Sequence, residues 1–227
     1  MTIKDNGLVY EINLATAEAS VVAVKNICSK IVIPEKISHY KVVEIANDSF
    51  WSVTGVDTIV IPATVHRIGM NAFRNCSVQN IHISDYSPQY SSQPLKDLII
   101  DTCAFKNCYH LKTVKLRKVT SFIGSWAFQN CINLETLSSW DISGTIQSLA
   151  FHNCTKLKSF TINGDMHITM EAFKDCQFST VKDWCSGKLM FDDSFLSNIQ
   201  DAHIVCHESS PLANLAYSGY NVNIYSF

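Results

Sequence analysis

Residues 56–76, which read VDTIVIPATVHRIGMNAFRNC, contain the pattern that the rest of this chain repeats. The stretch ends in an Ala-Phe-x-x-Cys motif, and copies of this motif recur along the sequence. The phenylalanines of the copies are Phe50, Phe73, Phe105, Phe128, Phe151, Phe173 and Phe195, at steps of 23, 32, 23, 23, 22 and 22 residues. A repeat of roughly 20 to 29 residues is typical of leucine-rich-repeat solenoids, whose coils bury their apolar sides only by stacking.

A second pattern, L-x-x-I-x-I, precedes the Phe motifs and is clearest over residues 56–61 and 111–116. Its last three positions alternate in hydrophobicity, which indicates a strand. A further apolar residue lies five positions before each phenylalanine; Gly69 and Gly124 follow it in two coils, which indicates a corner with a left-handed residue. The Phe motif itself has the spacing of a short helical turn. The sequence thus predicts an α/β-type repeat, with parallel strands on one face and short helical turns or loops on the other.

Together the two patterns resemble the BspA-like leucine-rich repeats of bacterial and protist surface proteins. The match is best over residues 56–76, including Ile61-Pro62 and Ile68-Gly69, and it extends over residues 31–205. The resemblance implies a right-handed leucine-rich-repeat solenoid of about seven coils. It also implies a cell-surface or secreted protein that binds another protein, with a host or matrix protein as the candidate partner.

The sequence predicts one domain over residues 1–227, with the coils at 31–205, an N-terminal hairpin cap at 1–30 and a C-terminal cap at 206–227. Solenoids need such atypical terminal units to shield the open ends of the core. In the N-terminal cap, two alternating segments, 8–12 and 20–24, are expected to pair as a hairpin.

The C-terminal cap contains a predicted short helix over residues 211–217. Ser209 or Ser210 is the expected N-cap, and Gly219 is expected to end the helix. A final strand follows at Val222-x-Ile224.

Five of the nine cysteines occupy one repeat position. They are Cys76, Cys108, Cys131, Cys154 and Cys176. Stacked strands place equivalent residues about 4.8 Å apart, which is within the Cα range of a disulfide. However, side chains in register point the same way, and a thiol packs well as a small hydrophobic group. We therefore predict a buried, reduced column, and the redox state of Cys28, Cys103, Cys185 and Cys206 stays open.

Composition and motifs argue against several classes of function. A formal net charge of −2 gives no basic stripe for nucleic acid. No apolar run approaches the roughly 18 to 20 residues of a membrane-spanning helix, and the N-terminus lacks the apolar core of a signal peptide. Glycine-rich phosphate loops and G-x-S-x-G are absent from the sequence, and His203-x-x-Cys206-His207 lacks a second ligand pair for zinc. We expect a non-enzymatic protein without cofactor, metal or membrane insertion.

The residues that flank the central apolar residue of each predicted strand are expected to point away from the core, in two columns. The candidate binding residues in these columns are Thr58, His82, Lys115, Thr136, Thr161 and Lys182. The columns are rich in hydroxyl groups. They form either an ordinary solvated face or a recognition surface for an extended protein or glycan.

The 32-residue step contains an insertion over residues 84–94, with Tyr86 and Tyr90 among serines and prolines. It is either a tolerated surface loop or a contact for a partner, with the tyrosines as anchors. A protein-binding module is the function that the sequence favours. A glycan-binding module, which a cluster of Trp140 with Tyr86 and Tyr90 would favour, and an unrecognised enzyme are the alternatives.

Overall fold

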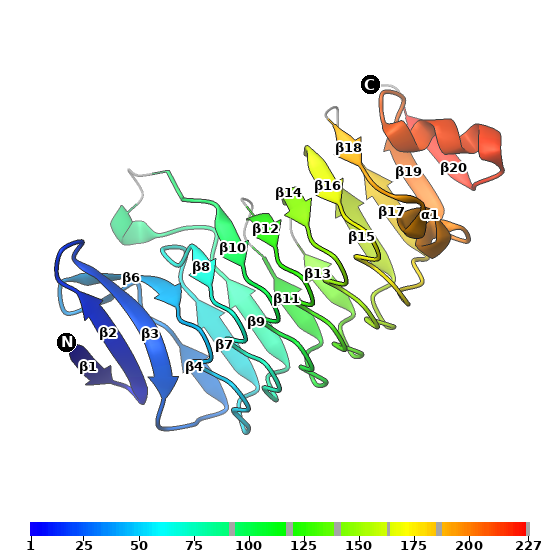
Figure 1. Cartoon of the computed structure of the whole chain (residues 1–227). Helices are drawn as coiled ribbons and strands as arrows, with labels where there is room; N and C mark the ends of the chain where they lie inside the picture. The colour runs from blue at the N-terminus through cyan, green and yellow to red at the C-terminus, as the bar shows by residue number, and fades with distance from the viewer. Residues whose placement is uncertain (91–93, 117–119, 139–141, 163, 185–187, 226–227) are drawn as a thin grey trace.

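The computed structural model describes residues 1–227 apart from 91–93, 117–119, 139–141, 163, 185–187 and 226–227. The described chain winds into an elongated β-solenoid of about seven turns, with the N-terminus at one end and the C-terminus at the other (Figure 1). A typical turn contributes two short strands, each paired in parallel with the equivalent strands of neighbouring turns. The fold is that of a leucine-rich repeat.

One side of the solenoid is an 11-stranded sheet, named sheet A. Its strands are β1 (Thr2–Asp5), β2 (Leu8–Asn13), β3 (Glu18–Val24), β5 (Lys36–Ile37), β6 (Tyr40–Ile45), β8 (Arg67–Ile68), β10 (Leu98–Ile100), β12 (Thr120–Ile123), β14 (Ile142–Ile146), β16 (Met166–Ile168) and β18 (Leu189–Met190). The pairs β1–β2, β2–β3 and β5–β6 are antiparallel, and the other pairs of sheet A are parallel.

The other side consists of two parallel sheets, one of five strands and one of four. Sheet B contains β4 (Lys30–Val32), β7 (Thr58–Ile61), β9 (Asn80–Ile83), β11 (Thr113–Lys115) and β13 (Thr136–Ser138). Sheet C contains β15 (Ser159–Ile162), β17 (Thr180–Asp183), β19 (His203–His207) and β20 (Val222–Tyr225). The described helices are η1 (Pro88–Tyr90), α1 (Asp193–Ile199) and η2 (Pro211–Ser218).

The L-x-x-I-x-I segments form the strands of sheets B and C, as predicted. The second apolar position of each coil also lies in a strand, so parallel strands line two sides of the solenoid instead of one. These strands of sheet A are mostly two to five residues long. Stacking supplies their hydrogen bonds, as when Gly69 N donates to the Ile45 carbonyl at 2.8 Å. Because α1 is the only α-helix in the described ranges, the α/β description holds only in part.

The Ala-Phe-x-x-Cys motifs form tight loops rather than helical turns. In six successive coils the residue two before the phenylalanine and the residue two after it both have positive φ, between 54° and 61°. The preceding residues are Asp48, Asn71, Cys103, Trp126, Leu149 and Glu171, and the following ones are Ser52, Asn75, Asn107, Asn130, Asn153 and Asp175. Left-handed residues interrupt a right-handed helix, which explains why the motif does not continue as one.

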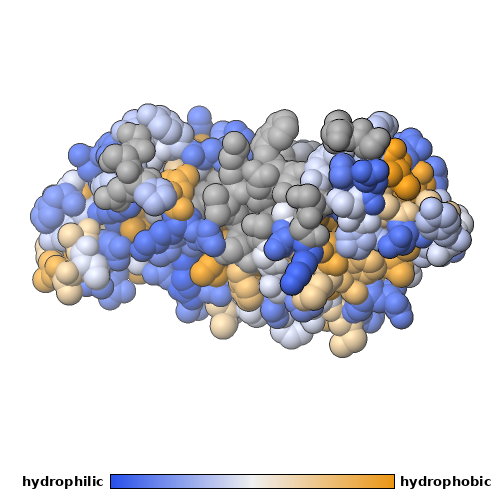
Figure 2. Space-filling view, turned by 90° about the horizontal axis from the view of Figure 1, so that it is seen from above, coloured by the Kyte–Doolittle hydropathy of each residue, from blue (hydrophilic) through white to orange (hydrophobic). Residues whose placement is uncertain are grey.

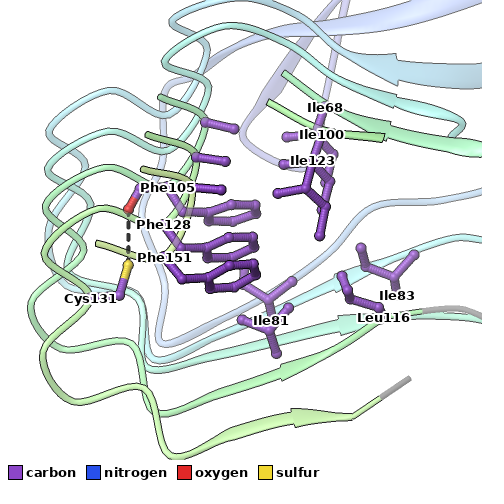
Figure 3. Close-up of a cluster of buried hydrophobic side chains, with 14 of the residues drawn as sticks. Ile68, Ile81, Ile83, Ile100, Phe105, Leu116, Ile123, Phe128, Cys131 and Phe151 are labelled. Carbon is purple, nitrogen blue, oxygen red and sulfur yellow. Dashed lines mark hydrogen bonds between the residues drawn. The ribbon is translucent and has the colours of Figure 1, made fainter. Parts of the chain in front are cut away.

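The phenylalanines stack in the interior between the two sides of the solenoid. Phe73, Phe105, Phe128, Phe151 and Phe173 are at most 1% exposed. Neighbouring rings in this series lie 4.9 to 5.0 Å apart between centroids and within 8° of parallel. Figure 3 shows the rings between isoleucines of sheet A and apolar side chains of sheet B. Coil stacking thus produces one continuous core.

Each loop adds two further ladders along the axis. The thiols of Cys108, Cys131, Cys154 and Cys176 donate to the phenylalanine carbonyl of the preceding coil, at 3.0 to 3.2 Å. The amides of Asn107, Asn130 and Asn153 donate to the equivalent asparagine of the preceding coil, at 2.9 to 3.1 Å. The described cysteines are all free. These thiol hydrogens therefore have backbone acceptors, so the reduced cysteines contribute hydrogen bonds between neighbouring coils.

Gly69 and Gly124 have a different role from the one expected, because neither has positive φ. A Cβ on Gly69 would lie 2.5 Å from the Asn47 side chain and 2.7 Å from its backbone nitrogen. A Cβ on Gly124 would lie 2.6 Å from the Thr102 nitrogen. Glycine is needed at these two positions because the backbone of the preceding coil leaves no room for a Cβ. The turn conformation does not require it.

Both ends contain the predicted local elements. Strands β2 and β3 form the antiparallel hairpin. Ser210 is the N-cap of η2, where its hydroxyl accepts from Leu212 N at 2.9 Å, and Gly219 ends the helix with φ 85°. The last copy of the Phe motif forms α1, because Asp192 caps this segment by accepting from the Ser194 and Phe195 amides.

Candidate binding surface

The strand face is defined here by the outward-pointing residues of β4, β7, β9, β11, β13, β15, β17 and β19. Register places Thr58, Asn80, Thr113 and Thr136 side by side in sheet B, and Val60, His82 and Lys115 in the adjoining column. In sheet C, Ser159, Thr180 and His203 form one column, and Thr161, Lys182 and Val205 form the other. Each of the two predicted columns is thus divided between sheets B and C. Lys115 lies on sheet B and Lys182 on sheet C.

The strand face is rich in hydrogen-bonding groups that partly satisfy one another. Thr113 Oγ1 donates to Asn80 Oδ1 at 2.7 Å. One position before the strands, Gln79 Nε2 donates to Asp57 Oδ1 at 2.8 Å, and Lys112 Nζ donates to Gln79 Oε1 at 3.2 Å. His82, Lys115, Thr136 and Lys182 are exposed, whereas Thr58 and Thr161 are half-buried. A partner would therefore meet a regular polar surface.

Charge on the strand face has one sign. Its charged outward positions are Lys30, Lys115 and Lys182, and no described outward position of these strands holds a carboxylate. The rings of His82, His203 and His207 also point outward. Asp183 points inward and is fully buried. The acidic Asp57 and Glu135 precede their strands, and Glu135 lies 3.7 Å from Lys156. The chain as a whole carries −2, so the strand face differs from the molecular average.

Sheet A presents a different electrostatic pattern. Arg67 on β8 pairs with Glu44 on β6, and its other nitrogen lies 2.6 Å from Asp101. Ser20 donates to Glu44 at 2.9 Å. Charges on this side are of both signs, and those of Arg67, Glu44 and Asp101 pair within the molecule.

The insertion places one of its two tyrosines, Tyr90, against sheet A. Tyr90, at the end of η1, is half-buried, and the Lys41 ammonium of β6 lies 4.4 Å from its ring centroid. Tyr86 is 64% exposed. A cavity of about 60 Å³ lies under the insertion, lined by Lys41, Thr64 and Tyr90 among others. Trp140 lies outside the described residues, so no aromatic cluster for a glycan is shown.

Sequence reasoning missed polar chains on the loop side of the solenoid. Gln129 and the Nδ1 of His152 lie 2.8 Å apart, and the Nε2 of His152 lies 2.9 Å from Asp175. The Arg74 guanidinium lies 5.3 Å from the ring centroid of Trp51, and the Lys106 ammonium lies 5.8 Å from that of Trp126. The copies of the Ala-Phe-x-x-Cys motif show that these residues recur at related positions, but they do not indicate that the side chains pair across coils.

Metal and membrane signals are weak in the described ranges. No group of three or more His, Cys, Asp or Glu residues there is placed to hold a metal ion. In β19, His203 and His207 point outward whereas Cys206 points inward and is buried. None of the described helices has both the length and the apolar character needed to cross a membrane. Viewed from above, the exposed apolar residues are scattered over the surface (Figure 2).

Comparison with protein families identifies the repeat. A model described as the BspA type leucine-rich repeat region, in six copies, matches residues 25–94 and 91–200. The chain belongs to the BspA-type leucine-rich repeat family. No functionally curated protein matches its sequence.

Two solved structures illustrate how the BspA-type chain relates to known folds. A leucine-rich cell surface protein from Faecalibacterium prausnitzii is 20% identical, with a TM-score of 0.55. The similarity covers 91% of this chain and 54% of that protein, so the chain spans about half its length. A leucine-rich repeat protein from T. pallidum is 14% identical, with a TM-score of 0.54 and 98% of each chain covered. At these identities the likeness concerns the fold alone.

Proposed function

We propose that this BspA-type protein is a non-enzymatic binding module whose strand face holds an extended, acidic segment of a partner protein. The observation that carries the proposal is the sign of the charge on this face. Lysines and histidines occupy outward strand positions, and carboxylates do not. Opposite charge on a partner steers its approach and selects it against basic competitors.

The shape of the surface favours an extended segment. Parallel strands repeat every 4.8 Å or so along the solenoid, and they present equivalent side chains at each step. In this arrangement Thr58, Thr136 and Thr161 supply hydroxyl groups, Lys115 and Lys182 supply positive charge, and His82 supplies a polar ring. The inward side of the strands packs against the phenylalanine core and is not available to a partner.

Protein is the favoured partner, because a glycan platform in the insertion would need Tyr90 beside the strand face. Tyr90 packs against Lys41 of sheet A instead. Tyr86, which is exposed, contributes apolar area to a contact near the end of β9. Function at the cell surface is supported by the fold that the chain shares with the F. prausnitzii cell surface protein. A host or matrix protein is the partner that we propose for this location.

The test compares Lys115→Ala/Lys182→Ala with Lys4→Ala/Lys36→Ala, which removes the same charge from sheet A. Binding to a polyglutamate peptide and to proteins captured from extracellular matrix is measured between low and high salt. We expect the first pair of substitutions to weaken binding and flatten its salt dependence, with stability changed by less than about 0.5 kcal/mol. The control pair leaves binding unchanged.

Two outcomes would contradict the proposal. One is equal loss of binding in both double variants, which would mean that only net charge matters. The other is unchanged binding in the Lys115/Lys182 variant and in a variant that lacks residues 84–94. A glycan array run beside the peptide distinguishes an acidic protein from an acidic glycan.

A further inference from the structure

The last described strand of sheet C has one unpaired edge. β20 pairs in parallel with β19, and within the described residues no strand pairs with its other edge. The Asn221 carbonyl accepts from the amide of Ile204 in β19 at 2.8 Å, and the Tyr225 carbonyl accepts from the amide of Glu208, the residue after β19, at 3.2 Å. Because hydrogen-bonding direction alternates along a strand, the N–H and C=O groups of Val222 and Ile224 face the open edge.

This edge lacks the features that protect the edges at the N-terminal end. The edge strand of sheet A, β1, contains Lys4 and Asp5, and the edge strand of sheet B, β4, contains Lys30. Natural edges are commonly blocked by such charges. In contrast, β20 reads Val-Asn-Ile-Tyr, without charge or proline.

Exposed apolar side chains surround the open edge. Ile224 and Tyr225 are each 45% exposed, and Trp184 lies 6.4 Å from Tyr225 between ring centroids. The helix η2 contacts both β19 and β20 and buries Leu212 and Ala213. This helix therefore covers a face of sheet C and leaves the edge of β20 accessible.

We propose that two copies of the chain associate through this edge, with their β20 strands antiparallel and Asn223 on the twofold axis. In this register Val222 lies opposite Ile224 of the second copy, and the two residues exchange the backbone hydrogen bonds that the open edge offers. The two Asn223 residues form the non-hydrogen-bonded pair at the centre, where their amides can bond to each other. Sheet C then continues across both copies.

A second copy is the occupant that the chemistry of the edge favours. The segment is self-complementary, because Val222 and Ile224 form two equivalent apolar pairs across the axis. It carries no charge, so like charges do not oppose each other when it meets itself. Twofold contacts use the same patch on both copies and close without forming a filament. The strand faces of the two copies lie on the same side of the joined sheet, because the axis is perpendicular to that sheet.

The first test is the molar mass of the 227-residue chain in solution, measured by sedimentation over a concentration series. The expected mass at high concentration is twice the 25.4 kDa of the chain. Ile224→Pro removes an N–H that does not bond to β19, so it is expected to halve this mass while the fold is kept. Ile224→Val keeps the N–H and retains the dimer. Ile224→Lys, which places a charge on each side of the axis, gives a monomer without relying on proline.

The second test is cross-linking between copies. The Cα atoms of the central pair in the proposed register are about 4.5 Å apart, within disulfide range. Asn223→Cys is therefore expected to form a disulfide-linked dimer under mild oxidation much faster than Tyr217→Cys, whose position is 91% exposed. Equal rates in the two variants, a monomer at all concentrations, or a dimer that survives in both Ile224→Pro and Ile224→Lys would overturn the proposal.

Discussion

The central coils and the last copy of the repeat use the same phenylalanine motif and fold it differently. Between Phe73 and Phe173, successive rings are 4.9 to 5.0 Å apart and nearly parallel. Between Phe173 and Phe195 the distance grows to 5.9 Å and the angle to 49°. The tight loop with two left-handed residues is replaced by α1 at this point. Within the described residues, the nearly parallel rings all belong to copies with this loop conformation. The conformation alone does not ensure parallel stacking, because Phe50 has the same loop and is tilted by 30° against Phe73.

The difference comes from the cap before the ring more than from the residue after it, because Ser52 is left-handed at the position that Ser197 occupies in the last copy. In four coils an asparagine occupies the second left-handed position, which asparagine tolerates better than most residues. The last copy has Ser197 there, and Asp192 accepts from the first amides of the segment. A capped helix satisfies these amides locally, whereas the central loops satisfy theirs by bonding to the next coil.

Removal of a central ring is expected to have the largest effect. Phe128 lies between two parallel rings, each 4.9 Å away. Phe128→Ala should lower the free energy of unfolding by about 3 to 5 kcal/mol, because it leaves a cavity in a core that cannot collapse along the axis. Phe195→Ala should cost about 1 kcal/mol less, because its ring lacks parallel partners. Chemical denaturation measures both, and equal costs would contradict this role of stacking.

The C-terminal end should depend instead on one hydroxyl group. Ser210 donates to the fully buried Asp183 and accepts from Leu212 N at 2.9 Å. Ser210→Ala is expected to cost about 2 kcal/mol, since it removes the cap of η2 and a partner of a buried carboxylate. The matched control is Ser209→Ala at the exposed neighbouring position, which should change stability by less than about 0.5 kcal/mol. Hydrogen exchange would locate the loss in η2 and β20.

Substitutions at Asn130 separate loop conformation from the asparagine ladder. Asn130 has φ 61° and bonds to Asn107 and Asn153. Asn130→Ala should cost about 1 to 2 kcal/mol, because alanine is strained in the left-handed region. Asn130→Gly removes the same side-chain hydrogen bonds without that strain and should be the less destabilised variant in thermal unfolding. If alanine were tolerated as well as glycine, the loop conformation would not be the source of the cost.

The smallest expected effect concerns pH. Burial raises the pKa of Cys76 from an ordinary 9.0 to about 12. Above pH 9 the unfolded chain releases the Cys76 proton, whereas the folded state keeps it. The free energy of unfolding is therefore highest below pH 9 and falls as the pH rises from 9 toward 12. At pH 10 the loss from Cys76 should be about 1.4 kcal/mol. Cys76→Ala should reduce the alkaline slope of stability, and Cys28→Ala, at an exposed position, should leave it unchanged.

Periodicity made the repeat and its apolar core readable. The phenylalanines, the cysteine column and the L-x-x-I-x-I strands recur at constant offsets, and burial at those offsets follows from stacking. The sequence pattern did not predict that the second apolar position of each coil lies in a strand of sheet A. A strand of two residues, such as β8, has no alternation to detect, and its hydrogen bonds come from other coils. The binding candidates, lysines included, were placed on strands by their spacing, but the contrast with the paired charges of sheet A needed the structure.

The sequence alone determined the repeat unit, the inward side of each strand and the reliance on stacking, because these depend on spacing and on apolar area. Tertiary structure decided the features that involve contact between coils. Trp126 and Leu149 adopt left-handed conformations that their side chains disfavour, and bonds such as Phe128 N to the Ala150 carbonyl, at 2.7 Å, hold the loops in place. The packing of Tyr90 on Lys41 and the open edge of β20 belong to the same class. No local pattern encodes them, because the groups that meet are distant in sequence.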